Sequence, residues 1–172
     1  MIAKRLFGRF VETSRSWNFE PSILSSQETA FTGGVLLPRV RDWVGSLGHR
    51  SLSLRADGGV PPGAISLAGL DFVPDLEIRE FESKLLAIEV KYLRDSDPSG
   101  SLAKSIGQAV LYKTLGFEYS CVLLVDCRSD AFRHWTSGQA RGILMPSSVG
   151  LAVFGSRDSK IESIATLLSP TD

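Results

Sequence analysis

The sequence contains little cysteine, little histidine and no excess charge of either sign. Its 172 residues include two cysteines and two histidines, and 19 Lys and Arg residues balance 19 Asp and Glu residues. Besides the two cysteines, only His49 and His134 could serve as zinc ligands, which does not indicate a structural zinc site. A neutral chain also lacks the basic excess that passive duplex-binding proteins usually carry. We therefore expect neither a zinc module nor tight, unassisted binding to duplex nucleic acid.

The chain also lacks signs of a disulfide, a membrane span or a signal peptide. Cys121 and Cys127 stand in or beside one apolar stretch, and a strand advancing about 3.3 Å per residue puts their thiols too far apart to bond. The longest apolar runs are too short to cross a bilayer. The N-terminal MIAKRLFGRF has no long apolar core and no cleavage site. We therefore expect a cytoplasmic protein with reduced thiols and no membrane partner.

What is present is the composition of a globular protein. Apolar residues make up 43% of the chain and charged residues 22%, which argues against disorder. The length suits one domain with a sizeable core. We predict a single domain over residues 1–172. It divides into an N-terminal arm (1–24), a core with the motifs (25–126) and a C-terminal helix–strand–helix (127–172).

Apolar spacing and capping residues predict four helices. The first covers about 26–47, with an interruption near Gly33-Gly34 or Pro38. The second begins with Ser101 as its cap and runs to about Leu115. A third covers about 130–141. The sequence Ser159-Lys160-Ile161-Glu162 has the form of a capping box that opens a last helix to Leu168.

Five segments have the character of strands, and they are separated by polar or Gly- and Pro-rich loops. A short polar connection joins the second and third of them, which predicts an antiparallel hairpin. Strands alternating with helices predict an α/β fold with a mixed central sheet flanked by helices. The predicted strands are 49–54, 71–78, 85–92, 119–126 and 149–154.

An acid-x-Lys triplet occurs three times in the chain, and its surroundings separate the three copies. Glu82-Ser83-Lys84 lies in the polar connection, and Asp158-Ser159-Lys160 lies at a predicted helix start. Only Glu89-Val90-Lys91 lies inside an apolar strand. Side chains alternate along a strand, so Glu89 and Lys91 share one face. Charges on such a strand are costly to bury unless they are paired or bind a metal.

The preceding strand adds carboxylates to the same region. Asp75 and Glu77 share a face, and a hairpin would place them beside Glu89 and Lys91. Converging carboxylates suit Mg²⁺, a hard cation that prefers oxygen ligands and keeps several waters. Such a metal lowers the pKa of a bound water. A nearby lysine can position that water and counter negative charge that develops on a phosphate.

These pieces together resemble the PD-(D/E)xK nuclease superfamily. The matching residues are Pro74-Asp75 and, after a hairpin, Glu89-Val90-Lys91. The resemblance implies a restriction-endonuclease-like core. It also implies that Asp75, Glu89 and the backbone carbonyl of Val90 bind Mg²⁺ or Mn²⁺, with Lys91 as the catalytic lysine. It covers about residues 70–126 and, more loosely, 25–126.

A third piece of sequence resembles the RecB-like branch of that superfamily. The predicted second helix contains Gln108-Ala109-Val110-Leu111-Tyr112, which matches the QxxxY motif of the branch. Gln108 and Tyr112 stand four residues apart and so share one helical face. In the branch this face borders the active site. An acidic residue of the first helix often joins the site there; Glu28 matches best, with Glu12 and Glu20 as competitors.

Each of these residues also has a structural interpretation. Asp75, Glu89 and Lys91 could form an ion-pair ladder on an edge strand, and Gln108 and Tyr112 could be a polar helix face packed on the sheet. Glu77 is either a second metal carboxylate or a solvated residue. His49 is expected to be structural. Four residues after the strand 119–126 could contact phosphates or form a solvated face: Arg128, Arg133, His134 and Arg141.

The sequence thus predicts a metal-dependent nuclease that hydrolyses phosphodiester bonds, with DNA as the expected substrate. Two alternatives remain open. One is a non-catalytic nucleic-acid-binding or scaffold protein on a nuclease fold, since a fold does not determine a function. The other is a nuclease subunit that is active only with a partner protein. A homodimer also remains open.

Overall fold

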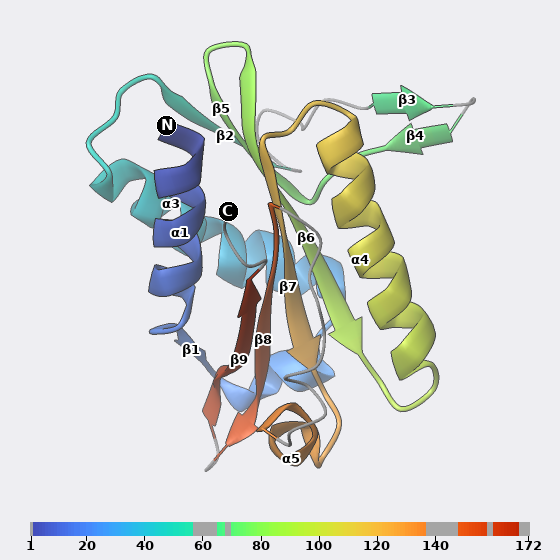
Figure 1. Cartoon of the computed structure of the whole chain (residues 1–172). Helices are drawn as coiled ribbons and strands as arrows, with labels where there is room; N and C mark the ends of the chain where they lie inside the picture. The colour runs from blue at the N-terminus through green and yellow to red at the C-terminus, as the bar shows by residue number, and fades with distance from the viewer. Residues whose placement is uncertain (1, 57–64, 68–69, 137–147, 158–159, 169–172) are drawn as a thin grey trace.

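A curled seven-stranded sheet runs through the molecule, with helices on both of its faces (Figure 1). The computed structural model describes residues 2–56, 65–67, 70–136, 148–157 and 160–168. The order of strands across the sheet is β1-β9-β8-β7-β6-β5-β2. Its strands are β1 (Asn18–Phe19), β2 (Leu52–Ala56), β5 (Leu76–Glu80), β6 (Ser83–Leu93), β7 (Tyr119–Asp126), β8 (Val149–Arg157) and β9 (Lys160–Leu168). A separate antiparallel pair is formed by β3 (Ile65–Leu67) and β4 (Leu70–Phe72).

The centre of the sheet is parallel and its margins are antiparallel. Strands β6, β7 and β8 run in the same direction, and every other pair in the sheet is antiparallel. Parallel neighbours require a crossover, and the helix α4 (Pro98–Thr114) supplies it between β6 and β7. The expectation of an α/β fold with a mixed central sheet is therefore confirmed. The predicted hairpin is the antiparallel pair β5–β6.

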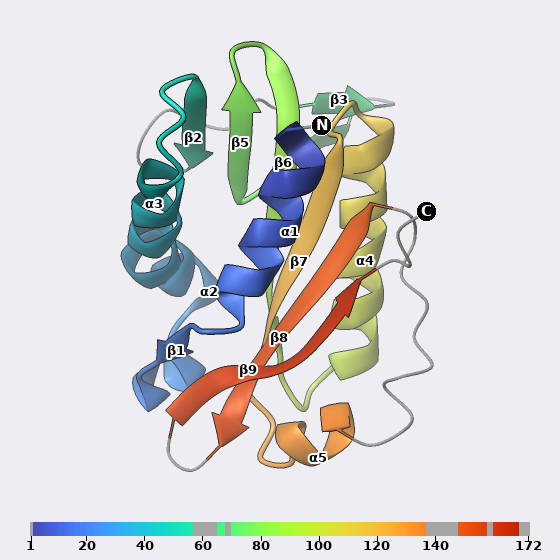
Figure 2. The same cartoon turned by 60° about the vertical axis from the view of Figure 1, so that its left-hand side comes forward.

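Two helices cover opposite faces of the sheet (Figure 2). The helix α1 (Ile2–Ser14) lies on one face and α4 on the other. The remaining helices are α2 (Glu28–Phe31), α3 (Leu37–Ser46) and α5 (Ala131–Thr136), with a 3₁₀ turn at Pro21–Ser25 and a π turn at Thr32–Leu36. No helix in the described ranges is long and apolar enough to cross a membrane.

The N-terminal segment corrects the prediction of an arm over residues 1–24. Its apolar residues recur at helical spacing and are buried in the main core: Ala3, Leu6, Phe7, Phe10 and Val11. Phe10 packs edge-on against Trp17 and Trp43. Each of the larger buried side chains among them contributes about 1.5–3 kcal/mol relative to exposure. Residues 2–14 are therefore an integral layer of the fold.

The C-terminal segment corrects the prediction of helix–strand–helix over residues 127–172. Residues 160–168 form the strand β9, antiparallel to β8, where a capping box had predicted a helix. Ile161 is buried in the main core, and β1 pairs with the far edge of β9. A strand edge offers a ladder of backbone hydrogen bonds that outweighs a local cap signal. Ser159 itself lies outside the described residues.

The other predicted boundaries hold to different degrees. The strand 119–126 is confirmed as β7, and the interruption predicted near Gly33-Gly34 is the π turn between α2 and α3. The predicted cap at Ser101 is wrong, because α4 begins one turn earlier with Asp97 accepting a hydrogen bond from the Gly100 N–H. The strand predicted over 71–78 divides into β4 and β5.

The remaining predicted elements are shifted or partly outside the description. The strand predicted over 49–54 is β2, beginning at Leu52, and the strand from Val149 extends to Arg157. The helix predicted over 130–141 is α5, which ends at Thr136, and residues 137–147 are not among those described. The loop predicted at 57–63 is likewise outside them. Cys121 and Cys127 are both free thiols, as expected.

Candidate active site

The hairpin β5–β6 brings Asp75 to the level of Glu89. Pairing between the two strands begins at Leu76 opposite Ile88, so Asp75 is the next residue out along β5. The Val90 N–H donates a hydrogen bond of 2.7 Å to Asp75 Oδ2. Strand β6 continues to Leu93 with no β5 partner beyond this point. The Asp75 carboxylate therefore takes a place on the β6 edge that a neighbouring strand would otherwise fill.

Lys91 lies between two carboxylates. Its ammonium is 3.2 Å from Glu89 Oε1 and 2.8 Å from Glu28 Oε1. Glu89 is almost fully buried, and the Lys91 side chain is about one-fifth exposed. The ion pair with Glu89 follows from strand alternation, which puts residues i and i+2 on one face. The contact with Glu28 is tertiary and brings the first turn of α2 to the site.

Tyr92 of β6 and Arg94, just after the end of β6, hold the segment that carries Glu28. The Tyr92 hydroxyl donates to the Ile23 carbonyl at 2.8 Å, and Arg94 Nη2 donates to the Ser26 carbonyl at 2.9 Å. The Tyr92 N–H in turn donates to Glu28 Oε2 at 3.1 Å. The sequence alone does not predict a role for Tyr92 or Arg94 at this site. Both residues stand at the polar end of an apolar stretch of sequence. That position does not indicate which groups they contact until the tertiary fold is known.

The helix α4 supplies a tyrosine to the same cluster. The Tyr112 hydroxyl donates to Glu89 Oε2 at 2.7 Å and lies 3.1 Å from the Val73 carbonyl oxygen. Gln108, one turn earlier on the same face, interacts with the Tyr112 hydroxyl. Gln108 Oε1 is buried and has no hydrogen-bond partner among the residues described. The structure thus brings both residues of the QxxxY pattern to the side of the sheet that bears Glu89.

Negative charge exceeds positive charge in this cluster, which contains three carboxylates and one ammonium. Burial raises the pKa of the Glu89 carboxyl, and the charge of Asp75 raises it further. Burial also raises the pKa of Asp75, against the hydrogen bond from Val90, which lowers it. Burial alone would lower the pKa of Lys91, but Glu28 and Glu89 together raise it. Lys91 therefore stays charged while two carboxylates are held in a repulsive arrangement.

A divalent cation would relieve this repulsion, and the donors present suit Mg²⁺ or Mn²⁺. Asp75 and Glu89 offer carboxylate oxygens from adjacent positions of paired strands. A residue in a strand directs its N–H and its carbonyl to the same side, so the Val90 carbonyl lies on the edge that its N–H shares with Asp75. Within the described part of the chain, no group of three or more His, Cys, Asp or Glu side chains is arranged to hold a metal. Mg²⁺ commonly needs only one or two carboxylates, with water completing its shell.

Three other candidate acids lie away from the cluster around Lys91 or pair with a residue outside it. Glu77 is buried and pairs with Arg79 on its own strand. Glu12 is exposed on α1, across the sheet from α4, and Glu20 is exposed before the 3₁₀ turn. Among the three competing acids, the structure therefore brings Glu28 to Lys91 and not Glu12 or Glu20.

The basic residues after β7 differ in their contacts and exposure. Arg128 donates from Nε and Nη2 to the buried Asp126, at 2.9 and 2.6 Å. His134 of α5 lies 2.8 Å from the carboxylate of Asp130, the residue that immediately precedes the helix. Arg133 is exposed, and Arg141 lies outside the described residues. The Arg128 guanidinium is thus committed to Asp126 in this structure.

Comparisons with protein-family models, with curated proteins and with solved structures found no match to this chain. The functional proposal therefore depends on the geometry of the site alone.

Proposed function

We propose that this chain is a metal-dependent nuclease that hydrolyses phosphodiester bonds in DNA and is built on a restriction-endonuclease-like core. One observation carries the proposal. Residues that the sequence motifs predict for the site are far apart in the chain, from Glu28 to Tyr112. In the structure, hydrogen bonds and ion pairs of 2.7 to 3.2 Å connect them. A surface ion-pair ladder would require only the β6 pair of Glu89 and Lys91.

Asp75, Glu89 and the Val90 carbonyl are the proposed ligands of Mg²⁺ or Mn²⁺. When bound, the metal supplies a water of lowered pKa and charge neutralisation at the scissile phosphate. The oxygen-only donor set suits a hard cation. Burial raises the pKa of both the Asp75 and the Glu89 carboxyl, and the charge of Asp75 raises the pKa of Glu89 further. A site built in this way gains stability when it takes up positive charge.

Lys91 is the proposed catalytic lysine. An ammonium has no lone pair to give a metal, so its contribution lies with the anionic phosphate and with the position of the attacking water. Its ion pairs with Glu28 and Glu89 fix the ammonium from two sides. Fixed charge aimed at a developing anion contributes to catalysis without reorganisation at the moment of reaction.

Tyr112 and Glu28 are proposed to orient the reacting groups. The Tyr112 hydroxyl fixes one oxygen of Glu89 while Lys91 contacts the other. Burial and the charge of Glu89 raise the pKa of the Tyr112 hydroxyl, so it remains a proton donor at any working pH. Partners of this kind, one step removed from the metal, hold its ligands in one orientation.

The test is a cleavage assay on single-stranded DNA, duplex DNA, branched DNA and RNA, with Mg²⁺, Mn²⁺ or a chelator. The wild type is compared with Lys91→Ala and Asp75→Asn. Lys160→Ala is the matched control, because Lys160 ends another acid-x-Lys triplet and is exposed at the start of β9. We expect metal-dependent cleavage by the wild type and by the control, and its loss in the two site variants.

Two results would contradict the proposal. Cleavage that Lys91→Ala retains at the wild-type rate would show that Lys91 only pairs with its neighbours. Binding of nucleic acid without cleavage of any substrate, in either metal, would favour the non-catalytic alternative on a nuclease fold.

A further inference from the structure

The tip of the β5–β6 hairpin presents an aromatic side chain to solvent. Phe81 is 75% exposed, which makes it the most exposed large hydrophobic residue among those described. It stands in a two-residue connection, because Glu80 pairs with Ser83 across the turn. Single exposed apolar residues are common, so exposure alone assigns Phe81 no role.

The backbone of Phe81 adds a second observation. Its φ angle is +53°, in the left-handed region that glycine, asparagine and aspartate favour at such turns. A bulky residue is an outlier there. Glycine at this position would form the turn with less strain and would not expose a phenyl ring. Strain of this kind points toward a functional use of the side chain.

The charges beside Phe81 indicate the kind of partner. Glu80 and Glu82 flank it on either side, and the Glu82 side chain is 96% exposed, with its carboxylate 3.9 Å from the mostly buried Arg79 guanidinium. Carboxylates at this position repel a phosphate backbone, which disfavours stacking of Phe81 on a nucleic-acid base. The tip instead suits an apolar pocket with a positively charged rim.

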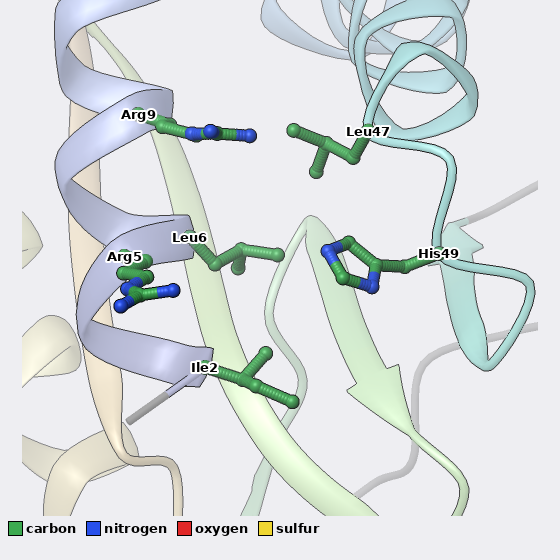
Figure 3. Close-up of a pocket in the computed structure, with 6 residues that line it drawn as sticks. All are labelled: Ile2, Arg5, Leu6, Arg9, Leu47 and His49. Carbon is green, nitrogen blue, oxygen red and sulfur yellow. The ribbon is translucent and has the colours of Figure 1, made fainter.

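The chain itself contains such a pocket (Figure 3). Side chains of α1 point across a gap toward Leu47 and His49, in the segment that follows α3. Three of the lining residues are apolar, and two are arginines with fixed positive charge. The pocket is lined by Ile2, Arg5, Leu6, Arg9, Leu47 and His49.

The pocket and the hairpin tip lie at the same end of the molecule. Strand β2 follows His49 closely and pairs with β5, so that Leu52 stands opposite Glu80. The Ser51 hydroxyl donates a hydrogen bond of 2.8 Å to Glu80 Oε1. In Figures 1 and 2 the hairpin stands beside the start of α1. A surface that carries both an insert and a matching pocket can pair with a copy of itself about a two-fold axis.

We propose that Phe81 of one copy inserts into the pocket between α1 and the segment after α3 of a second copy, and that the exchange is reciprocal. The phenyl ring contacts Leu6 and Leu47, while Glu82 faces Arg5 and Arg9 of the other copy. The contact closes on itself, so it forms a dimer and not a filament. This inference does not depend on the proposed nuclease activity.

The test is sedimentation velocity of the full chain over a wide range of concentration. We expect the wild type to pass from monomer to dimer, and Phe81→Gly to weaken self-association roughly tenfold or more, the loss expected for an anchoring aromatic. Thermal unfolding checks that Phe81→Gly is folded, and glycine suits the backbone at this position. Phe132→Ala is the matched control, because Phe132 is also exposed, on α5, and should leave the dimer unchanged.

Charge reversal tests the pocket separately. Arg9→Glu and Glu82→Arg should each weaken the dimer, and the two together should recover much of it. The proposal is overturned if the wild type is monomeric at every concentration, or if Phe81→Gly associates as strongly as the wild type. It is also overturned if the double variant recovers nothing, because Phe81 would then engage a different surface.

Discussion

Two charged clusters in this molecule, each centred on a buried acid, have the same arrangement. Each has an acid and a base separated by one residue near the end of a parallel strand, and each has an aromatic donor from a following helix. Both aromatic donors bind their carboxylate closely, at 2.7 and 2.8 Å. The clusters are Glu89-Val90-Lys91 with Tyr112, and Asp126-Cys127-Arg128 with Trp135.

The two clusters differ in their charge balance. Asp126 receives hydrogen bonds from the Arg128 N–H, from Arg128 Nε and Nη2, and from Trp135 Nε1, so one acid meets one base and several donors. Around Lys91, in contrast, three carboxylates share one ammonium. The charges of the Asp126 cluster are balanced, whereas the Glu89 cluster holds more negative than positive charge. We infer that an excess of carboxylates over basic groups, more than burial itself, distinguishes a candidate site from a structural ion pair.

The largest expected difference concerns the two basic residues. Lys91→Ala should reduce the cleavage rate by roughly 10²- to 10³-fold, the usual cost of one electrostatic partner of a transition state. Arg128→Ala should leave the rate unchanged but lower the free energy of unfolding by on the order of 3 kcal/mol, because Asp126 stays buried without its counter-ion. Cleavage kinetics and urea unfolding of both variants check the pair. Equal activity losses in the two variants would remove the distinction between the clusters.

The acids should respond in opposite directions. Asp126→Asn should destabilise the protein by about 2 kcal/mol, since it weakens charge-assisted hydrogen bonds from Arg128 and Trp135. Asp75→Asn should stabilise the metal-free protein by up to about 1 kcal/mol, because the repulsion with Glu89 disappears. Urea unfolding in a chelator measures both effects. A destabilised Asp75→Asn protein would mean that the carboxylate is needed for folding.

The aromatic donors offer a smaller and finer comparison. Tyr112→Phe should lower activity by roughly tenfold at a stability cost of about 1 kcal/mol, as when a partner of a metal ligand is removed. The hydrogen bond from Tyr112 lowers the pKa of Glu89, so its loss should also move the acidic limb of the pH–rate profile upward. Trp135→Phe should cost similar stability and leave that profile in place. Movement of the profile in both variants would argue against a separate role for Tyr112.

The smallest expected effect is a dependence of stability on pH. The pKa values of Asp75 and Glu89 lie above their ordinary values of 3.8 and 4.5, so the folded chain binds protons more tightly than the unfolded chain. The stability from these two groups is full below pH 3.8 and is lost as pH rises through the folded pKa values. The proposed Mg²⁺ would bind the ionised forms of these carboxyls, so its stabilising effect should grow from acidic to neutral pH. Thermal unfolding with Mg²⁺ or a chelator measures this increase in stabilisation with pH. The increase should largely disappear in Asp75→Asn and persist in Asp126→Asn.

The sequence predicted the strand part of the candidate site well, for a local reason. Alternation along β6 determines that Glu89 and Lys91 share a face, and a hairpin with a short connection brings Asp75 beside them. Spacing along one helix determines that Gln108 and Tyr112 face together. These relations depend on the chain within a few residues or on one hairpin, so they can be predicted without knowledge of the fold.

Tertiary partners determined the parts that the sequence did not predict. The segment from Ile2 to Ser14 has helical spacing, but its apolar face gains stability only when it packs on the sheet. Residues 160–168 form a strand because β8 offers them an edge, although Ser159 to Glu162 resembles a helix cap. The balanced cluster at Asp126 escaped notice because Trp135 reaches it from a separate helix.

The edge of β6 beyond Ile88 has a consequence for the behaviour of the protein in solution. Open strand edges invite pairing with other chains, and proteins protect them with charge or with covering segments. Here the carboxylates of Asp75 and Glu28 accept the Val90 and Tyr92 N–H groups that a further strand would bind. The same acids that form the candidate site thus also guard the sheet against aggregation. Removing both carboxylates would expose the edge of an apolar strand to other copies of the protein. The same substitutions would then lower both solubility and activity.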